Sequence, residues 1–437
     1  MQRSELKLGF CSRQYRGGGG KQLTTLNDQR LLLYATGRNA HIPDDREPIS
    51  KPPKPVTMSH PLSLIAVLSL LFLLSTAAAT TVGVTYISSP GLPPPEDVVA
   101  LLQSLKITAV RLPVADPNII RAFSYTNISL FLAIPNSLIS SISANRSAAS
   151  RWLYDHVIPF YPRAHITAIS VGTNVLAEGD VTSADLVIPA IHNIHRSLID
   201  MGIQQIMIST TFSFVNIMTT SFPPSSAEFQ EPASNFIIKP LLDYLRETNS
   251  SFFVSLYPYS VYKLRPEIPI GFALFQEHAY NFREDTVTGV RYRNLFDLMV
   301  DAVIAAMAVA GHENIPVVVA ETGWPSFDPA NEVEARDVYS KMYLQGLVKH
   351  LRSDKGTPLR KEGVTEVYIY ELFDTNDTAT KGLKSDGIGQ KWGFSYPNMS
   401  TKFEVCFSNC GSIMTLAVVI TMIAMEFLLL IDFDGDY

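Results

Sequence analysis

The chain lacks most of the groups on which metal, redox and nucleotide chemistry depend. It has 437 residues but only 3 cysteines, Cys11, Cys406 and Cys410, none of them between residues 80 and 405. Two neighbouring thiols near the C-terminus do not make a metal site. They either pair with each other or lie in a segment that is removed. No glycine-rich phosphate loop follows the first predicted strand, which argues against a nucleotide-binding open sheet. We therefore expect neither a metal nor a cofactor.

Charge is also scarce, and it is unevenly placed. Charged residues make up 17% of the chain, and the formal net charge is −6. Residues 1–57 carry 10 Lys and Arg against 5 Asp and Glu, which leaves −11 for residues 58–437. An acidic body argues against nucleic acid and anionic membrane surfaces as partners. It fits a neutral ligand such as a polysaccharide.

The N-terminal segments are not typical of a folded domain. Residues 1–57 contain four consecutive glycines and a Pro/Lys stretch, and we interpret them as an upstream extension, disordered or an artefact of the gene model. Residues 58–79 hold an apolar run followed by Ser-Thr-Ala-Ala-Ala, which predicts a secretory signal peptide cut after Ala79. The alternatives are an uncleaved anchor over 62–79 or a transit peptide within 1–57. Five Asn-x-Ser/Thr triplets agree with secretion: Asn127, Asn145, Asn249, Asn376 and Asn398.

The C-terminal tail, residues 406–437, contains an apolar run over 413–431 that is broken by Glu426. Small residues precede the run, as in a lipid-anchor signal. The short polar spacer and the acidic end over 432–437 disagree with that pattern, and a spanning helix fits no better. We expect a monomer in the extracellular space or cell wall, with attachment to the outer face of the plasma membrane through this tail.

Between these ends, short apolar strands alternate with helical patterns. Alternation of this kind predicts an α/β protein with a parallel sheet, and eight units close into a single (β/α)8 TIM barrel over residues 80–405. The predicted strands cover 82–86, 109–112, 130–134, 167–171, 206–209, 253–257, 317–320 and 368–372. The predicted helices include 95–105, 185–200, 295–310 and 333–351.

The strongest candidate for chemistry is Glu321, at the end of the seventh predicted strand. Reactive groups of such barrels lie where the strands end at the C-terminal face. Glu321 is followed by Thr-Gly-Trp-Pro-Ser, which predicts a sharp exit with the Trp324 ring at the rim. Sugars stack on such rings, and a carboxylate beside one can attack an anomeric carbon. A structural carboxylate paired with a buried base is the alternative.

This segment resembles the nucleophile motif of the plant endo-1,3-β-glucosidases, glycoside hydrolase family 17. Further matching segments follow in order over residues 82 to about 396, among them Gly-Leu-Pro-Pro-Pro at 91–95, Tyr-Pro-Tyr at 257–259 and Trp-Gly-Phe at 392–394. The resemblance implies a barrel with an open groove for 1,3-β-glucan or a related wall polysaccharide, and a retaining mechanism with Glu321 as nucleophile. It also predicts substrate contacts from Tyr86, Thr173, Tyr257, Trp324 and Phe373.

The general acid of the family has no counterpart in this sequence. In the family the fourth strand ends Val-Gly-Asn-Glu, and that Glu is the general acid. This chain has Val-Gly-Thr-Asn there, so Asn174 stands at the acid position. The nearest carboxylate is Glu178. Other groove positions differ from the family as well. This chain has Ser255-Leu256 where the family has Asn-Ala, and Thr375 where the family has a glutamate. The resemblance is to an atypical, anchored branch associated with cell-wall organisation.

Two hypotheses remain at this point. The first is a wall protein that binds glucan and hydrolyses it weakly or not at all, since an amide cannot transfer a proton. The second is an active endo-1,3-β-glucosidase in which Glu178 or another residue supplies the acid. A transglycosylase would need the same missing acid.

Overall fold

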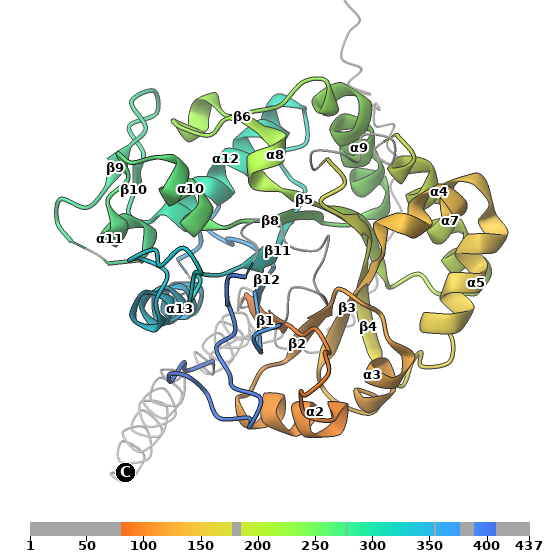
Figure 1. The fold of residues 1–437 in the computed structure, drawn as a ribbon. Helices are drawn as coiled ribbons and strands as arrows, with labels where there is room; N and C mark the ends of the chain where they lie inside the picture. The colour runs from red at the N-terminus through yellow and green to blue at the C-terminus, as the bar shows by residue number, and fades with distance from the viewer. Residues whose placement is uncertain (1–79, 177–184, 277, 354, 376–388, 408–437) are drawn as a thin grey trace, which may run out of the picture. The chain divides into compact units, whose positions relative to one another are not determined.

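The computed structural model describes residues 80–176, 185–276, 278–353, 355–375 and 389–407. Eight parallel strands close into a barrel in the order β1-β12-β11-β8-β5-β4-β3-β2. Figure 1 views the barrel along its axis, with the helices packed around the outside. The predicted (β/α)8 barrel is confirmed.

All eight predicted strands are present, some with shifted ends. The barrel strands are β1 (Thr81–Thr85), β2 (Ala109–Leu112), β3 (Ser129–Ile134), β4 (His165–Thr173), β5 (Met207–Ser213), β8 (Phe252–Ser255), β11 (Val317–Thr322) and β12 (Glu366–Ile369). In the described part of the chain, two short antiparallel pairs lie outside the barrel: β6 (Met218–Thr220) with β7 (Glu228–Phe229), and β9 (Arg283–Glu284) with β10 (Arg291–Tyr292).

The helices follow the strands as the crossover connections of a parallel barrel require. The α-helices are α2 (Pro95–Ser104), α3 (Pro117–Ala122), α4 (Ile139–Ala144), α5 (Arg146–His156), α7 (Val187–Asp200), α8 (Phe214–Ile217), α9 (Lys239–Thr248), α10 (Pro258–Leu264), α11 (Ile270–Ala273), α12 (Leu295–Val309) and α13 (Asp337–Leu351). Two 3₁₀ turns are η1 (Asn136–Leu138) and η2 (Pro224–Ser226), and η3 (Ser234–Ile238) is a π-helical turn directly before α9.

Two boundaries differ from the prediction for local reasons. The helix expected over 333–351 begins only at Asp337, because Arg336 is extended and pairs in a β-bridge with Phe327. The strand expected over 253–257 ends at Ser255, because Tyr257 caps a new helix that starts with Pro258. Proline at the first helical position fixes φ and lacks an N–H that would be unpaired there anyway.

The barrel interior is filled by side chains. A buried layer of aromatic and small residues lies inside the strands, where the Phe131 ring contacts Phe253 and Tyr368 at centroid distances of 4.7 and 5.4 Å. A larger apolar cluster lies between strands and helices. Because the lumen is packed, a ligand has access only at the ends of the barrel.

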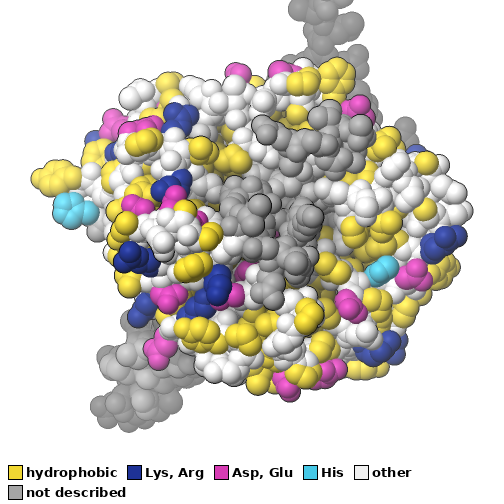
Figure 2. All heavy atoms as spheres, viewed as in Figure 1, with side chains coloured by type: hydrophobic (Ala, Val, Ile, Leu, Met, Phe, Trp, Pro, Cys, Tyr) yellow, Lys and Arg dark blue, Asp and Glu magenta, His cyan; other side chains and the backbone are white. Residues whose placement is uncertain are grey.

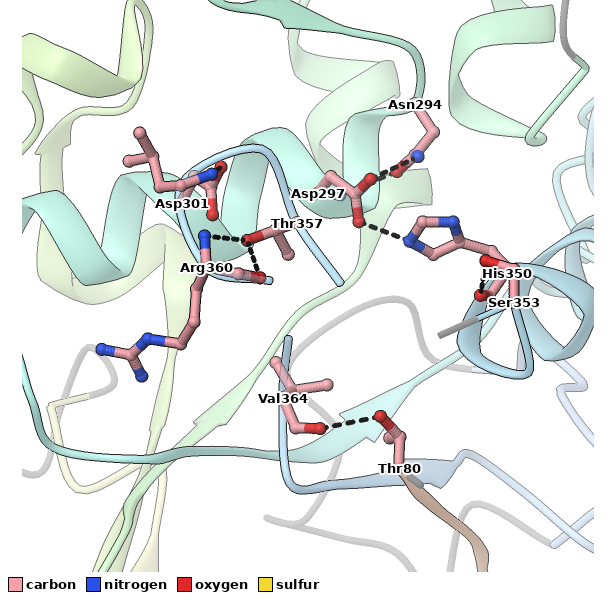
Figure 3. Close-up of polar contacts among 10 residues, drawn as sticks. Thr80, Asn294, Asp297, Asp301, His350, Ser353, Thr357, Arg360 and Val364 are labelled. Carbon is pink, nitrogen blue, oxygen red and sulfur yellow. Dashed lines mark hydrogen bonds and ion pairs between the residues drawn. The ribbon is translucent and has the colours of Figure 1, made fainter. Parts of the chain in front are cut away.

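A polar cluster joins α12 and α13 near the start of β1 and β12, at the N-terminal end of the barrel (Figure 3). The side chain of Asn294 accepts from the backbone N–H of Asp297 at 2.7 Å and donates to its carboxylate at 2.8 Å. The other carboxylate oxygen of Asp297 lies 2.8 Å from Nε2 of His350. This cluster lies at the end opposite the strand exits, so we assign it to stability.

Asp301 lies beside this cluster, and its raised pKa leads us to expect that the stability of the fold depends on pH. It is buried, accepts from the backbone N–H of Leu359 at 2.9 Å, and burial raises its pKa to about 7. The folded state therefore holds a proton that the unfolded chain releases near pH ~4. The free energy of unfolding should fall by up to about 1.4 kcal/mol per pH unit as the pH rises from ~4 to ~7, from this group alone. Thermal unfolding of Asp301→Asn across that range should lack this component; an identical profile contradicts the assignment.

No helix of the described residues is long and apolar enough to cross a membrane. Cys406 is the one cysteine among them, and it is disulfide-bonded. The predicted signal peptide over 58–79 and most of the tail over 406–437 lie outside the described residues.

Candidate active site

Glu321 lies near the C-terminal end of β11, at the mouth of the barrel. The preceding residues of its strand are apolar and buried, and Glu321 itself is only 5% exposed. A carboxylate buried this deeply requires compensating partners, because an isolated charge in a low-dielectric interior is costly. The structure supplies three of them.

A guanidinium, a phenol and an alcohol all donate to Glu321. Nη1 of Arg111 lies 2.5 Å from Oε1, while Tyr257 OH and Ser255 Oγ lie 2.8 and 3.2 Å from Oε2. These donors come from β2, from the loop after β8 and from β8 itself. They fix the orientation of the carboxylate and balance its charge, as a preorganised nucleophile requires.

Arg111 is fully buried, and it also connects Glu321 to the end of β4. Its Nη2 lies 3.4 Å from the Thr173 hydroxyl. The side-chain amide of Asn136 holds the backbone of Thr173. The amide oxygen accepts from the Thr173 N–H at 2.8 Å, and the amide nitrogen donates to the Thr173 carbonyl at 2.9 Å. Thr173 and Glu321 are therefore brought to one site, which the predicted substrate contact of Thr173 requires.

Tyr257 remains a hydrogen-bond donor at any working pH. Burial, and then the negative charge of Glu321, raise the pKa of this phenol well above 10. Its ring contacts Trp392 and Tyr370 edge-on, at centroid distances of 5.3 and 6.2 Å. An aromatic wall thus borders the carboxylate on one side.

Asn174 follows β4 directly, with φ of +56°. Asparagine tolerates this left-handed conformation better than most residues. Its backbone N–H donates to Thr211 at 2.8 Å, and its side-chain oxygen is buried with no hydrogen bond to a described residue. Gly172, two residues earlier, has φ of +80°, and a Cβ there would lie 2.7 Å from Ile139. The backbone at this exit is therefore sharply turned. Glu178 lies outside the described residues.

Trp324 is the clearest departure from the predicted site. Its side chain is 1% exposed, packs against Tyr259 at 5.1 Å, and its indole N–H donates to the Glu334 carbonyl at 2.7 Å. The expected ring at the rim is wrong: Gly323 lets β11 approach β12 so closely that a Cβ would lie 2.4 Å from the Tyr370 carbonyl. The following tryptophan turns into the core and leaves no free face for a sugar.

The predicted contacts Tyr86 and Phe373 form a separate pair. They meet edge to face at 6.2 Å between β1 and the exit of β12, and they are only 1% and 2% exposed. Burial raises the pKa of the Tyr86 phenol. Because the two rings are buried against each other, we assign the pair to packing at the barrel mouth.

Two polar residues of the site did not stand out in the sequence. Arg111 lies in the strand Ala-Val-Arg-Leu, and Glu371 follows Tyr-Ile-Tyr at the end of the last strand. A charged residue in a short buried strand must be paired, because its desolvation otherwise costs several kcal/mol. That rule alone could have identified both positions.

A closed parallel barrel with a donor-held carboxylate at the end of its seventh strand is an arrangement suited to glycoside cleavage. The sequence comparison narrows this class. The family model described as glycosyl hydrolases family 17 matches residues 82–407, most of the chain. The chain therefore belongs to glycosyl hydrolases family 17.

Similar proteins include two from Arabidopsis thaliana. Glucan endo-1,3-beta-glucosidase 12 is 34% identical over 78% of this chain and 62% of its own length. Glucan endo-1,3-beta-glucosidase 11 is 35% identical over 74% of this chain and 75% of its own length. The match to this chain thus covers less than two thirds of the length of glucan endo-1,3-beta-glucosidase 12.

Solved structures agree with the fold. CJP38, a beta-1,3-glucanase and allergen of Cryptomeria japonica pollen, is 32% identical with a TM-score of 0.69, covering 75% of this chain and 99% of that one. A plant beta-glucan endohydrolase is 30% identical with a TM-score of 0.66, covering 74% and 100%.

No group of three or more His, Cys, Asp or Glu side chains able to hold a metal occurs in the described part of the chain. The face of the barrel seen in Figure 2 is mostly uncharged, with Lys and Arg interspersed among Asp and Glu.

Proposed function

We propose that this protein binds 1,3-β-glucan, or a closely related wall polysaccharide, at the mouth of its barrel and hydrolyses it slowly. The observation that carries the proposal is the contrast between the two strand exits. Glu321 is held by three donors, whereas an amide, Asn174, stands at the end of β4. On this view the protein organises cell wall rather than degrading bulk glucan.

In a retaining reaction the Glu321 carboxylate attacks the anomeric carbon and the bond to the leaving oxygen breaks. The electron pair of that bond goes to the leaving oxygen, which then needs a proton. An amide can donate a hydrogen bond but cannot transfer its proton. In the second step water must lose a proton as it attacks the glycosyl-enzyme ester, and Asn174 cannot accept that proton either.

Arg111, Tyr257 and Ser255 keep the carboxylate in place without protonating it. Because the phenol pKa of Tyr257 lies well above 10, this residue donates a hydrogen bond rather than a proton. The nucleophilic half of the machinery is thus supported by the described contacts, and the acid half is not. An active endo-1,3-β-glucosidase with an acid supplied by another residue is the second candidate, favoured by the three donors that hold Glu321.

The test is a glucan-binding assay run beside a hydrolysis assay on the same preparation. Retention on insoluble 1,3-β-glucan with slow release of sugar supports the proposal. Release as rapid as that by ordinary members of the family supports the second candidate. If the protein neither binds 1,3-β-glucan nor releases sugar from it, 1,3-β-glucan is not its ligand.

We further propose secretion to the extracellular space or cell wall, with attachment of the tail to the outer membrane face. The expected mature N-terminus lies near Thr80, since the preceding apolar run is followed by small residues. In the structure Thr80 directly precedes β1, and its hydroxyl donates to the Val364 carbonyl at 2.9 Å. N-terminal sequencing of secreted protein tests this; recovery of residues 1–57 contradicts it. Recovery of the 432–437 tail excludes a processed anchor.

A further inference from the structure

A cleft of about 230 Å³ lies at the N-terminal end of the barrel, where β8 and β11 begin. The end of α9 with residues 249–250 forms one wall, and residues 311–316 form the other. The backbone N–H of Phe252 donates to the Pro316 carbonyl at 2.8 Å, which joins the two walls at the start of the strands. Glu321 lies at the opposite end of the barrel, so a group bound in this cleft leaves the barrel mouth open.

Both walls of the cleft are held in place by side chains. Oδ1 of Asp243, on α9, lies 3.3 Å from Nε2 of His312, which ties the helix to the 311–316 loop. Arg360 donates to the Ile315 carbonyl at 2.9 Å. Figure 3 shows the guanidinium of Arg360 directed away from the polar cluster around Asp297. These contacts preform the cleft, as is usual for sites that receive a small ligand.

Asn249 lies in the wall of this cleft and ends α9. Its side chain is exposed, and its backbone is left-handed with φ of +50°, a conformation common for asparagine at the C-terminus of a helix. With Ser250 and Ser251 it forms the triplet Asn-Ser-Ser, an acceptor sequence for an N-linked oligosaccharide. The cleft and the acceptor side chain therefore occur together.

The lining of the cleft suits one sugar ring. A pyranose has apolar C–H faces and polar hydroxyl edges, and the cleft offers apolar surface from Leu245, Ile315 and Pro316 beside the polar groups of Arg246 and Glu313. The two charges are of opposite sign, so the cleft does not select an ion of either sign. Sites for drug-sized ligands measure about 300–1,000 Å³, so this smaller cleft fits a unit the size of a single sugar.

We propose that Asn249 carries an N-linked oligosaccharide and that its first sugar packs into this cleft. In the transfer, Nδ2 of Asn249 forms a bond to C1 of an N-acetylglucosamine, and the bond from that carbon to a phosphate oxygen of a lipid-diphosphate donor breaks. The lipid diphosphate leaves with the electron pair, and Nδ2 loses one proton to a base of the transferase. The inference goes beyond glucan binding and rests only on the proposed secretion.

The position of Ser251 sets the order of events. Its hydroxyl belongs to the acceptor triplet, yet in the folded chain Ser251 is only 4% exposed and directly precedes β8. The transferase must therefore act before β8 pairs with β11. The sugar is already attached when the two walls come together, and the cleft forms beside it.

Glycopeptide mass spectrometry of the full chain, expressed in a eukaryotic host that makes oligomannose glycans, tests the attachment. The peptide with Asn249 should carry a glycan. Ser251→Ala should abolish it, whereas the matched control Ser250→Ala keeps the triplet and should retain it. Protein that reaches the cell surface or the medium with Asn249 unmodified overturns the inference alone. Protein that stays in the cytosol unmodified overturns the proposed secretion as well.

The rate of sugar removal tests the packing. An endoglycosidase that cuts between the first two sugars should act on Asn249 of the native protein at least about 10-fold more slowly than on the denatured chain, because the glycan must first leave the cleft. Asn314→Trp places a large ring on the exposed wall of the cleft and should remove this protection. Equal rates on native and denatured protein, or protection that persists in Asn314→Trp, overturn the packing.

Discussion

Replacing Glu321 by glutamine is expected to reduce cleavage of an activated β-glucoside by at least about 10⁴-fold, the scale seen when hydrolases lose their nucleophile. Glutamine keeps the size of the side chain and can still accept from Tyr257 and Ser255. It cannot form the glycosyl ester, because an amide oxygen is too weak a nucleophile. The measurement is kcat/KM on a substrate with a very good leaving group, with folding monitored by circular dichroism.

The matched control is Glu332→Gln. Glu332 lies in the loop after β11, where Tyr259 and Lys263 donate to it at 2.5 and 2.9 Å. It has no contact with Glu321 among the described residues, so its replacement should leave kcat/KM unchanged. Comparable decreases in both variants would point to misfolding, and full activity in Glu321→Gln would remove Glu321 from the reaction.

Introducing an acid at position 174 is expected to have the opposite effect. Asn174→Glu should raise hydrolysis of unactivated 1,3-β-glucan by about 10²–10⁴-fold, the usual contribution of general acid catalysis. A glutamate there can protonate the leaving oxygen and later accept a proton from water. The left-handed backbone at position 174 opposes the change, since glutamate tolerates positive φ less well than asparagine. Reducing-sugar release from soluble glucan is the readout.

Asn174→Gln provides the control for this variant, because it lengthens the side chain without adding an acid. It should give no increase. If Asn174→Glu also gives none while glucan still binds, the altered groove contacts limit the reaction more than the missing acid does. If the unaltered chain already matches ordinary relatives, another carboxylate supplies the proton, and Glu178 is the first to replace.

The fold could be predicted because its determinants are local and repeated. Eight apolar segments separated by helical patterns allow few arrangements other than a closed parallel barrel. Boundaries were less predictable where long-range pairing overrides local pattern. Arg336, for example, is held extended by a bridge to Phe327, which no local signal near residue 336 announces.

The position of Glu321 could also be predicted, but its surroundings could not. Whether Trp324 points to solvent or to the core depends on how closely two strands approach, which Gly323 permits and a window of sequence does not reveal. Arg111 is separated from Glu321 by 210 residues, so only the closed barrel brings them together.

The dependence of rate on leaving group tests the central claim most directly. The claim is that Glu321 is ready to attack while no acid assists at the end of β4. The measurement compares kcat/KM of the unaltered chain for a dinitrophenyl β-glucoside of a glucan oligosaccharide and for the unactivated glucan. The account predicts rapid cleavage of the first and slow cleavage of the second, with Asn174→Glu accelerating only the second. Efficient cleavage of both by the unaltered chain would contradict it.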